Sequence, residues 1–456
     1  MLNKTLHYSV AIIFSALIIT GCRPDDGNGP ISVSTPTAAF DSQAPYRWNE
    51  LFLEIDRYSP GYRPPAAARM LGYTYLAAYE AVAPGMAAYK PIAKRVYGVQ
   101  IPDAQTGQQY YWPEAANAAY GYMFRKFYPH IAQVYIDKIA ALETGFETSF
   151  STAGVTPEVM ERSRNYGRAV ATVIFDWSAT DAQGHEAYLR TNPTDYTPPV
   201  GTGLWKPTAP DYTRALFPYW GQTRAFAVRP ADKIGLQPLR YSTSQESAYY
   251  AQQAEVVTLT TPLSAENKWI AEFWGDDIFR LTFEPSGRWV AIADQIVLAK
   301  RTNLETATYL FAKLGMAMAD GAICTWNTKY YYNTERPLDY INAYINPTWT
   351  SHLLTLHNCT NPPFPGYPSG HATFGAAAAG VLNSVFGKNT SFTDKCHEAR
   401  TEFNGTPRTF RNFDAAAKEN AFSRIPLGVH IRQDADEGLR LGYLAAQRVN
   451  ALPWQR

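Results

Sequence analysis

The chain has 456 residues, of which 46% are hydrophobic, so it is long and apolar enough to bury a substantial core and is not expected to be disordered. Its 41 Lys and Arg against 40 Asp and Glu leave a formal net charge of +1, which argues against a nucleic-acid-binding protein. Specificity for an anionic ligand would therefore have to come from a local cluster of cations.

The first 21 residues have the pattern of a signal peptide. Lys4 supplies the positive charge, and the apolar run of residues 10–19 is too short to span a bilayer as a permanent helix. The small residue directly before Cys22 resembles a bacterial lipobox, which implies cleavage before Cys22 and lipidation of its thiol. We therefore expect an exported lipoprotein that faces the periplasm or the cell surface and meets the membrane only through Cys22. An ordinary signal peptide with an incidental cysteine is the alternative.

The rest of the chain divides into a tether and two helical halves. Residues 22–45 are expected to be a flexible tether, because residues 23–36 are rich in Pro, Gly, Asp and Ser. An N-terminal helical half then spans residues 46–245, and a C-terminal half spans residues 246–456. We expect the second half to carry the chemistry.

Helical signals dominate both halves. Residues 64–82 begin with two prolines, which are favoured in the first turn of a helix, and continue with good helix formers and apolar residues at three- and four-residue steps. The same pattern predicts helices in residues 160–180, 264–277, 293–326 and 436–452. About residues 188–239 the chain is rich in Pro, Gly and Thr, as in a long ordered loop. Since regularly alternating strands are missing, the sequence predicts an all-α fold, a large helical-bundle architecture of two four-helix-bundle-like halves.

Three separated stretches hold polar residues that a packed core does not explain. In the first, Lys329 and Arg336 are seven residues apart, close to two helical turns, so both cations are expected on one helix face. Pro337 limits how far that helix runs. In the second, Ser369-Gly370-His371 opens an alanine-rich helix, at the end where backbone N–H groups are unpaired and the helix dipole is positive.

The third stretch runs from Ser423 to Asp434. Pro426 and Gly428 keep the segment between Arg424 and His430 from being regular helix. From His430 onward we expect a helix to resume, with Asp434 one turn later and able to bond the second ring nitrogen of the histidine.

Taken singly, each stretch has a structural explanation as a solvated helix face, a cap with a turn, or a surface pair. Together they supply three permanent cations, a hydroxyl, a helix N-terminus and two histidines. This set fits a tetrahedral oxyanion, either phosphate or vanadate, because guanidinium groups match its oxygens in pairs and lysine adds a point charge.

Three cysteines remain after Cys22. Cys359 and Cys396 are expected to pair in a disulfide, because both lie in loop-like sequence and an oxidising compartment permits the bond. Cys324 lies in an apolar helical run and is expected to be a buried thiol. The cysteine spacings do not match those of a zinc site.

The three patterns, Lys-x6-Arg-Pro, Pro-Ser-Gly-His and Ser-Arg-x5-His-x3-Asp, resemble the signature motifs of the type 2 phosphatidic acid phosphatases and the vanadium-dependent haloperoxidases. All three match without a gap or substitution. Trp326, three residues before Lys329, and Phe364, seven before His371, favour the haloperoxidase branch, as in fungal chloroperoxidases and bacterial iodoperoxidases. The likeness covers residues 266–445, about 40% of the chain.

The resemblance implies a vanadate cofactor without haem, and hydrogen peroxide and halide as substrates. His430 would bind vanadium, Asp434 would orient its ring, and His371 would act as the acid and base. The vanadate oxygens would be neutralised by Lys329, Arg336, Ser369, Gly370 and Arg424.

The resemblance also assigns the surroundings of this centre. In the stretch "IAEFWGDD", Asp277 would support the second arginine of the site. Trp326 and Phe364 would form a drier wall on the path of the halide, or else pack as ordinary core residues.

Two other functions compete with halide oxidation, for which iodide or bromide is the expected substrate. An acid phosphatase on the same framework would use His430 as the nucleophile that forms a phosphohistidine, and His371 to protonate the leaving alcohol. Phosphate is accordingly expected to compete with vanadate. A ligand-binding lipoprotein that holds a glycan or a peptide is a more remote alternative, and the oligomeric state stays open.

Overall fold

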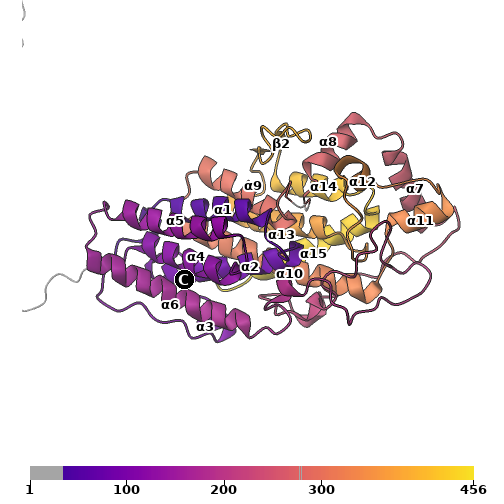
Figure 1. Cartoon of the computed structure of the whole chain (residues 1–456). Coiled ribbons are helices and arrows are strands. Elements are labelled where there is room, and N and C mark those ends of the chain that lie inside the picture. The colour runs from indigo at the N-terminus through magenta and orange to yellow at the C-terminus, as the bar shows by residue number, and fades with distance from the viewer. Residues whose placement is uncertain (1–33, 277, 279) are drawn as a thin grey trace, which may run out of the picture.

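The computed structural model describes residues 34–276, 278 and 280–456, so the predicted signal peptide, the anchor at Cys22 and Asp277 lie outside the described residues. The described chain is mainly helical, as predicted, and elongated, with α1 to α6 at one end and α7, α11 and α12 at the other (Figure 1). Its helices are α1 (Gln43–Asp56), α2 (Pro64–Val82), α3 (Ala93–Tyr97), α4 (Trp112–Phe127), α5 (Gln133–Phe150), α6 (Pro157–Ala179), α7 (Ala248–Thr260), α8 (Ala265–Phe273), α9 (Pro285–Ala299), α10 (Leu304–Tyr332), α11 (Pro337–Tyr344), α12 (His352–His357), α13 (Gly370–Phe386), α14 (Phe413–Ser423) and α15 (Arg432–Asn450). None of these helices combines the length and the apolar character needed to cross a bilayer.

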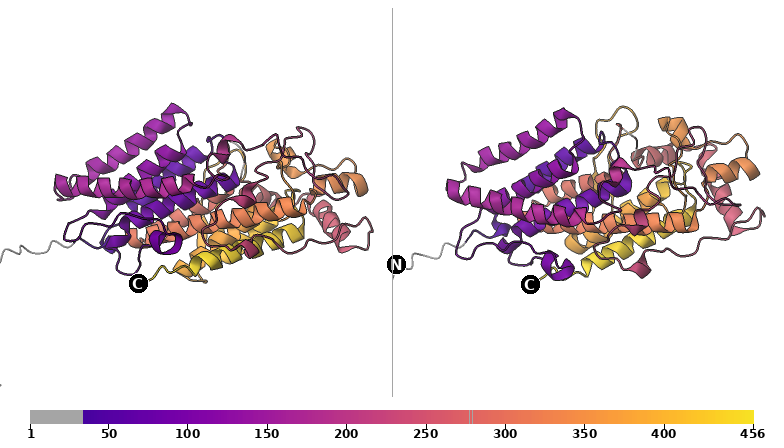
Figure 2. Two further views of the ribbon diagram at one scale, coloured as in Figure 1. Left: turned by 90° about the horizontal axis from the view of Figure 1, so that it is seen from below. Right: turned by 60° about the horizontal axis from the view of Figure 1, so that its bottom comes forward.

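The 29-residue helix α10 joins the two ends of the molecule. It packs on α2 from the N-terminal end and on α13 and α15 from the C-terminal half. The crossing with α2 is close because both helices place a glycine there: a Cβ on Gly315 would lie 2.9 Å from the carbonyl oxygen of Leu71 and 3.0 Å from the Cα of Gly72. Figure 2 shows the same arrangement from two other sides, with the N-terminal helices stacked against one end of the C-terminal ones.

Helices α13 and α15 pack against each other through small side chains. A Cβ on Gly442 of α15 would lie 2.2 Å from the carbonyl oxygen of Thr373, and one on Gly438 would lie 2.4 Å from that of Ser369. The alanines of α13 therefore serve close contact between two backbones. This contact brings the start of α13 beside the start of α15, where the N–H of Ser369 donates to the carbonyl oxygen of Asp434 at 2.8 Å.

Two helix predictions need correction. Residues 293–326 are two helices, because the chain leaves α9 at Lys300 and the side chain of Asn303 caps α10 by accepting from the N–H of Thr306 at 2.9 Å. The expectation of one helix face for Lys329 and Arg336 is also wrong. Helix α10 ends at Tyr332, Asn333 turns the chain with a φ of 52°, and Arg336 is the N-cap of α11.

The N-terminal boundary of the folded part also differs from the predicted one. The tether was expected to reach residue 45, but residues 34–45 pack on the helices. The hydroxyl of Thr37 donates to the carbonyl oxygen of Val82 at 3.0 Å, and that of Ser34 accepts from the N–H of Tyr110 at 2.9 Å. Helix α1 then begins at Gln43.

The long loop between α6 and α7 is held onto α10 by one carboxylate. Asp320 is fully buried and accepts three successive backbone N–H groups of the loop, those of residues 226–228, at 2.6 to 2.8 Å. Short 3₁₀ turns interrupt the loop, and its Trp205 and Trp220 are buried. The composition of this segment predicted an ordered loop correctly.

A short hairpin in the C-terminal half was not predicted. Strands β1 (Phe392–Asp394) and β2 (Arg408–Phe410) pair antiparallel, with Asp394 opposite Arg408. The predicted disulfide is wrong, because Cys359 and Cys396 are both free thiols. The Cys396 sulfur lies 3.2 Å from the Gln295 amide nitrogen beside β1, whereas Cys359 packs against an apolar cluster under α12. Cys324 is buried, as expected.

Candidate active site

The first turn of α13 presents Ser369, Gly370 and His371 to the interior. Ser369 is the N-cap, and its hydroxyl accepts from the N–H of Ala372 at 3.4 Å. The ring of His371 hydrogen-bonds to the backbone of Asp276, while its Nε2 is buried without a hydrogen-bond partner among the described residues. Burial and the nearby Arg424 hold the pKa of His371 well below its usual value, so the ring is neutral.

The second histidine, His430, is oriented by the residue one turn later, as predicted. Its Nδ1 lies 3.1 Å from Oδ2 of Asp434, and its Nε2 lies 3.2 Å from a terminal guanidinium nitrogen of Arg336. Burial, followed by the charge of Arg336, holds the pKa of His430 well below its usual value. The neutral ring therefore donates from Nδ1 and carries its lone pair on Nε2, which faces the cations.

Two of these cations are completely buried. The Nζ of Lys329 donates to the carbonyl oxygens of Pro365 and Gly366 at 2.7 and 3.0 Å, and Arg336 donates to those of Phe364 and Val429 at 3.0 and 2.8 Å. Both charges lie 4.9 Å from the ring centre of Phe364. Sequence spacing placed them on one helix, but it is the chain reversal after α10 that brings them together.

The carboxylate of Asp434 acts on both cations only through space, without a direct ion pair. In the described residues, neither Lys329 nor Arg336 forms an ion pair with a carboxylate, and the Nη2 atom of Arg336 is buried without a partner. Burial lowers the pKa of Lys329 well below its usual value and that of Arg336 to about 9. Buried charges are normally paired, so this arrangement fits a bound anion with several oxygens, such as vanadate or phosphate.

Arg424 joins the group from the end of α14. It is 2% exposed, and its guanidinium donates to the carbonyl oxygen of Trp274 at 3.2 Å. Arg424 also lines a cleft of about 560 Å³, together with Phe364, Leu216 and Asp276. The cleft therefore reaches the candidate site at Arg424 and Phe364.

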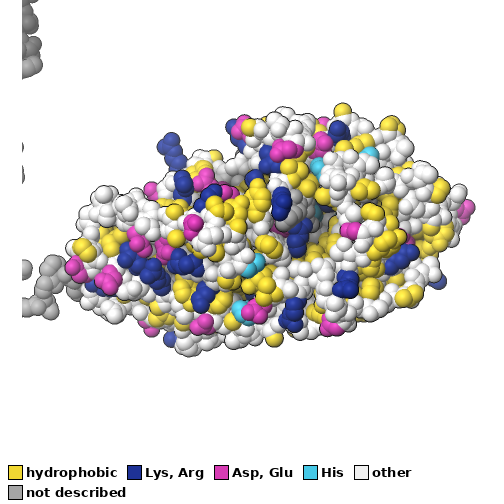
Figure 3. All heavy atoms as spheres, viewed as in Figure 1, with side chains coloured by type: hydrophobic (Ala, Val, Ile, Leu, Met, Phe, Trp, Pro, Cys, Tyr) yellow, Lys and Arg dark blue, Asp and Glu magenta, His cyan; other side chains and the backbone are white. Residues whose placement is uncertain are grey.

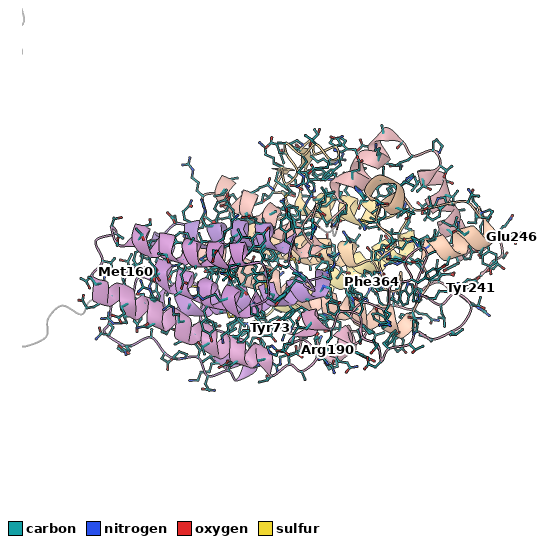
Figure 4. The ribbon with its side chains drawn as sticks, viewed as in Figure 1. Tyr73, Met160, Arg190, Tyr241, Glu246 and Phe364 are labelled. Atoms are coloured by element: carbon teal, nitrogen blue, oxygen red, sulfur yellow. The ribbon has the colours of Figure 1, made fainter. Side chains whose placement is uncertain are left out.

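The two aromatic residues of the predicted halide wall have different positions. Phe364 lines the cleft, and its ring centre lies 5.2 Å from that of Trp326. Trp326 is 1% exposed and donates from its indole nitrogen to the carbonyl oxygen of Leu216 at 3.3 Å. Figure 4 shows Phe364 between the N-terminal helices and the far end, which carries Tyr241 and Glu246. Trp326 thus supports Phe364 from behind.

The stretch "IAEFWGDD" was singled out in the sequence for Asp277, but two other residues of that stretch contact the site in the structure. Trp274 and Asp276 act through backbone groups that bond to Arg424 and His371, and a backbone acceptor can belong to any residue type. Leu216 reaches the cleft from the long loop.

Comparison with known proteins places these features in a family. Residues 309–452 match the family model described as the VCPO second helical-bundle domain. The vanadium chloroperoxidase of Curvularia inaequalis is 26% identical over 278 residues, which are 48% of this chain and 46% of that protein, so the match spans about half of that relative.

Solved structures resemble most of the chain. A bacterial vanadium-dependent iodoperoxidase superposes with a TM-score of 0.78 at 28% identity, covering 91% of this chain and 97% of its own. A holo-type bacterial vanadium-dependent chloroperoxidase, with a TM-score of 0.66 over 86% of this chain and 92% of its own, is 16% identical and shows the fold alone. In its second helical-bundle domain and in its overall fold, the chain is thus similar to the vanadium-dependent haloperoxidases.

Proposed function

We propose that the protein oxidises halide with hydrogen peroxide to hypohalous acid, using vanadate as its cofactor. The observation that carries this proposal is a pair of fully buried cations, Lys329 and Arg336, beside the lone pair on Nε2 of His430. Neither cation forms a direct ion pair with a carboxylate among the described residues. A vanadate anion supplies both the negative charge and a central atom for this nitrogen. On the face shown in Figure 3, basic and acidic side chains are interspersed, so the selectivity for an anion is a property of the buried cluster.

Each residue has a distinct task in this proposal. The three cations and the hydroxyl of Ser369, with the N–H of Gly370, hold the anion's oxygens, and Nε2 of His430 binds vanadium. When bound, vanadate acts as a Lewis acid that activates peroxide without changing its oxidation state. Asp434 keeps the proton of His430 on Nδ1 and so keeps Nε2 available.

In this proposal His371 accepts the proton that hydrogen peroxide releases. Its neutral ring has a buried, unpartnered Nε2 among the described residues, and this atom can take a proton from incoming hydrogen peroxide. The hydrogen bond from the ring to the backbone of Asp276 fixes which nitrogen is free. Phe364 gives the halide a dry wall at the cleft. We propose iodide or bromide as the halide, since the iodoperoxidase is similar over nearly its whole length and iodide is the more easily oxidised.

The decisive test compares halide oxidation with phosphate-ester hydrolysis, each with and without orthovanadate. We expect the reconstituted protein to oxidise iodide or bromide with peroxide, and phosphate to inhibit by competing for the cations. The His430→Ala variant should lose vanadium on gel filtration, whereas His185→Ala in the N-terminal half should retain it. Turnover of phosphate esters without vanadate, and no halide oxidation with it, would instead favour the phosphatase.

The cellular location of the protein is also part of the proposal. We propose export and anchoring through a lipid on Cys22, based on the sequence pattern that precedes it. Mass spectrometry of the membrane-bound form should find a modified cysteine as its first residue.

A further inference from the structure

Behind the site lies a completely buried arginine that none of the three motifs contains. Arg288 of α9 donates from Nε and Nη2 to Oδ2 of Asp394 at 3.1 and 2.8 Å, and its Nη1 lies 3.5 Å from Oδ1 of Asp276. The same nitrogen contacts the ring of His397. A guanidinium in this position balances two buried carboxylates that come from different parts of the chain.

The guanidinium is also enclosed by aromatic rings. Its central carbon lies 4.5 Å from the ring centre of Phe273 and 4.6 Å from that of Trp274. Arg288 therefore contacts the segment of residues 273–276 both through stacking and through charge. Arginine suits this role better than lysine, because its planar guanidinium can stack on aromatic rings and donate paired hydrogen bonds to a carboxylate at the same time.

This segment makes two backbone contacts with the active site. The carbonyl oxygen of Trp274 accepts from Arg424, and the backbone of Asp276 bonds to the ring of His371. Residues 274–276 of this segment follow the end of α8 and are not themselves helical. The hydroxyl of Thr282, which donates to the carbonyl oxygen of Gly275 at 3.2 Å, is a further support.

We propose that Arg288 is a positioning residue for the active site. By holding the ring of Trp274 and the carboxylate of Asp276, it sets where Arg424 and His371 stand around the bound anion. The effect on turnover rests on the proposed haloperoxidase function, whereas the effect on anion binding does not depend on it.

The test is the Arg288→Lys variant, which keeps the buried positive charge. It loses the paired hydrogen bonds to Asp394 and the planar surface that stacks on Phe273 and Trp274. Arg69→Lys is the matched control, because Arg69 is also buried, pairs with Asp181 at 3.2 Å and stacks on Tyr73 at 4.7 Å, but lies in the N-terminal half. We expect Arg288→Lys to weaken phosphate binding by the vanadate-free protein by about 10- to 100-fold, as for supporting residues of metal sites. We expect the kcat of the vanadate-loaded protein to fall by a similar factor.

The Arg69→Lys control and the KM for halide distinguish a positioning role of Arg288 from a general loss of stability. Arg69→Lys should leave phosphate affinity and kcat unchanged even where it lowers the melting temperature, and the KM for halide should stay within about twofold in Arg288→Lys. A folded Arg288→Lys variant with wild-type phosphate affinity would overturn the proposal, as would an equal loss of affinity in Arg69→Lys.

If Arg288→Lys does not fold, the same measurements are made on Asp394→Asn. This substitution weakens the ion pair with Arg288 while keeping the shape of the side chain at position 394. If wild-type protein oxidises no halide, the proposed function fails and phosphate affinity alone decides on Arg288.

Discussion

Lys329 and Arg336 show how single residues can create an anion site in a nearly neutral protein. Each is fully buried and bonds to groups that carry no formal charge, namely carbonyl oxygens and, for Arg336, Nε2 of His430. Burial lowers the pKa of both side chains, which means that the empty site disfavours their charged forms. An anion that enters restores those forms, so binding and protonation are coupled.

This coupling predicts how anion binding depends on pH. Sulfate is a suitable probe because its charge is constant from neutral to alkaline pH. As the pH rises through the lowered pKa values, about 9 for Arg336, the empty site loses protons that the bound form needs. Sulfate affinity should therefore fall, by up to about tenfold per pH unit for one coupled proton.

Calorimetric titration at several pH values, in two buffers of different ionisation enthalpy, measures both the affinity and the proton uptake. Lys329→Met should bind sulfate weakly throughout and with a smaller pH dependence. An affinity that stays constant up to about pH 10 would show that the cations keep their protons without an anion.

At the scale of elements, the α13–α15 contact decides whether the two histidines of the candidate site lie close together. His371 lies in the first turn of α13, and His430 lies two residues before the start of α15. Glycines on α15 allow the two backbones to touch, and the bond from Ser369 to Asp434 ties the helix starts together. The alanine-rich sequence of α13 is thus part of the geometry of the site.

A methyl group in this contact should damage stability and activity together. In Gly442→Ala the new carbon would lie 2.2 Å from the carbonyl oxygen of Thr373, which is backbone and can move only with α13. We expect a loss of about 1–3 kcal/mol in the free energy of unfolding, and a lower kcat.

Gly145→Ala is the matched control, because Gly145 lies in α5 with open space around its Cα. This variant should gain about 0.5–1 kcal/mol from helix propensity and keep full activity. Chemical denaturation measures both, and an equally stable Gly442→Ala would mean that the helices can separate without cost.

The whole molecule has one core that runs through both helical halves. Buried residues from Trp48 in α1 to Trp454 at the C-terminal end belong to the same apolar cluster. The C-terminus also packs on the N-terminal half, since the N–H of Arg456 donates to the carbonyl oxygen of Ala88 at 3.1 Å. The two halves that the sequence suggests are therefore packed as one unit, and α10 forms the joint between them.

A shared core predicts that the halves unfold together. On heating, the far-ultraviolet circular dichroism and the tryptophan fluorescence should change in one transition with the same midpoint, because losing either half exposes the core face of the other. Two separated transitions would indicate that the contact between α2 and α10 is weaker than its close packing suggests.

The sequence by itself determined the helical class, the positions of α2, α6, α8, α13 and α15, and the residue types of the candidate site, because helix periodicity and residue type are local properties. It could not determine that Lys329 and Arg336 meet across a chain reversal, or that Cys359 and Cys396 lie apart. These outcomes depend on how distant elements pack, and only the tertiary structure decides that. The same holds for the residues that support the site, because Arg288 and the backbone of Trp274 contact neighbours that are far away in the chain.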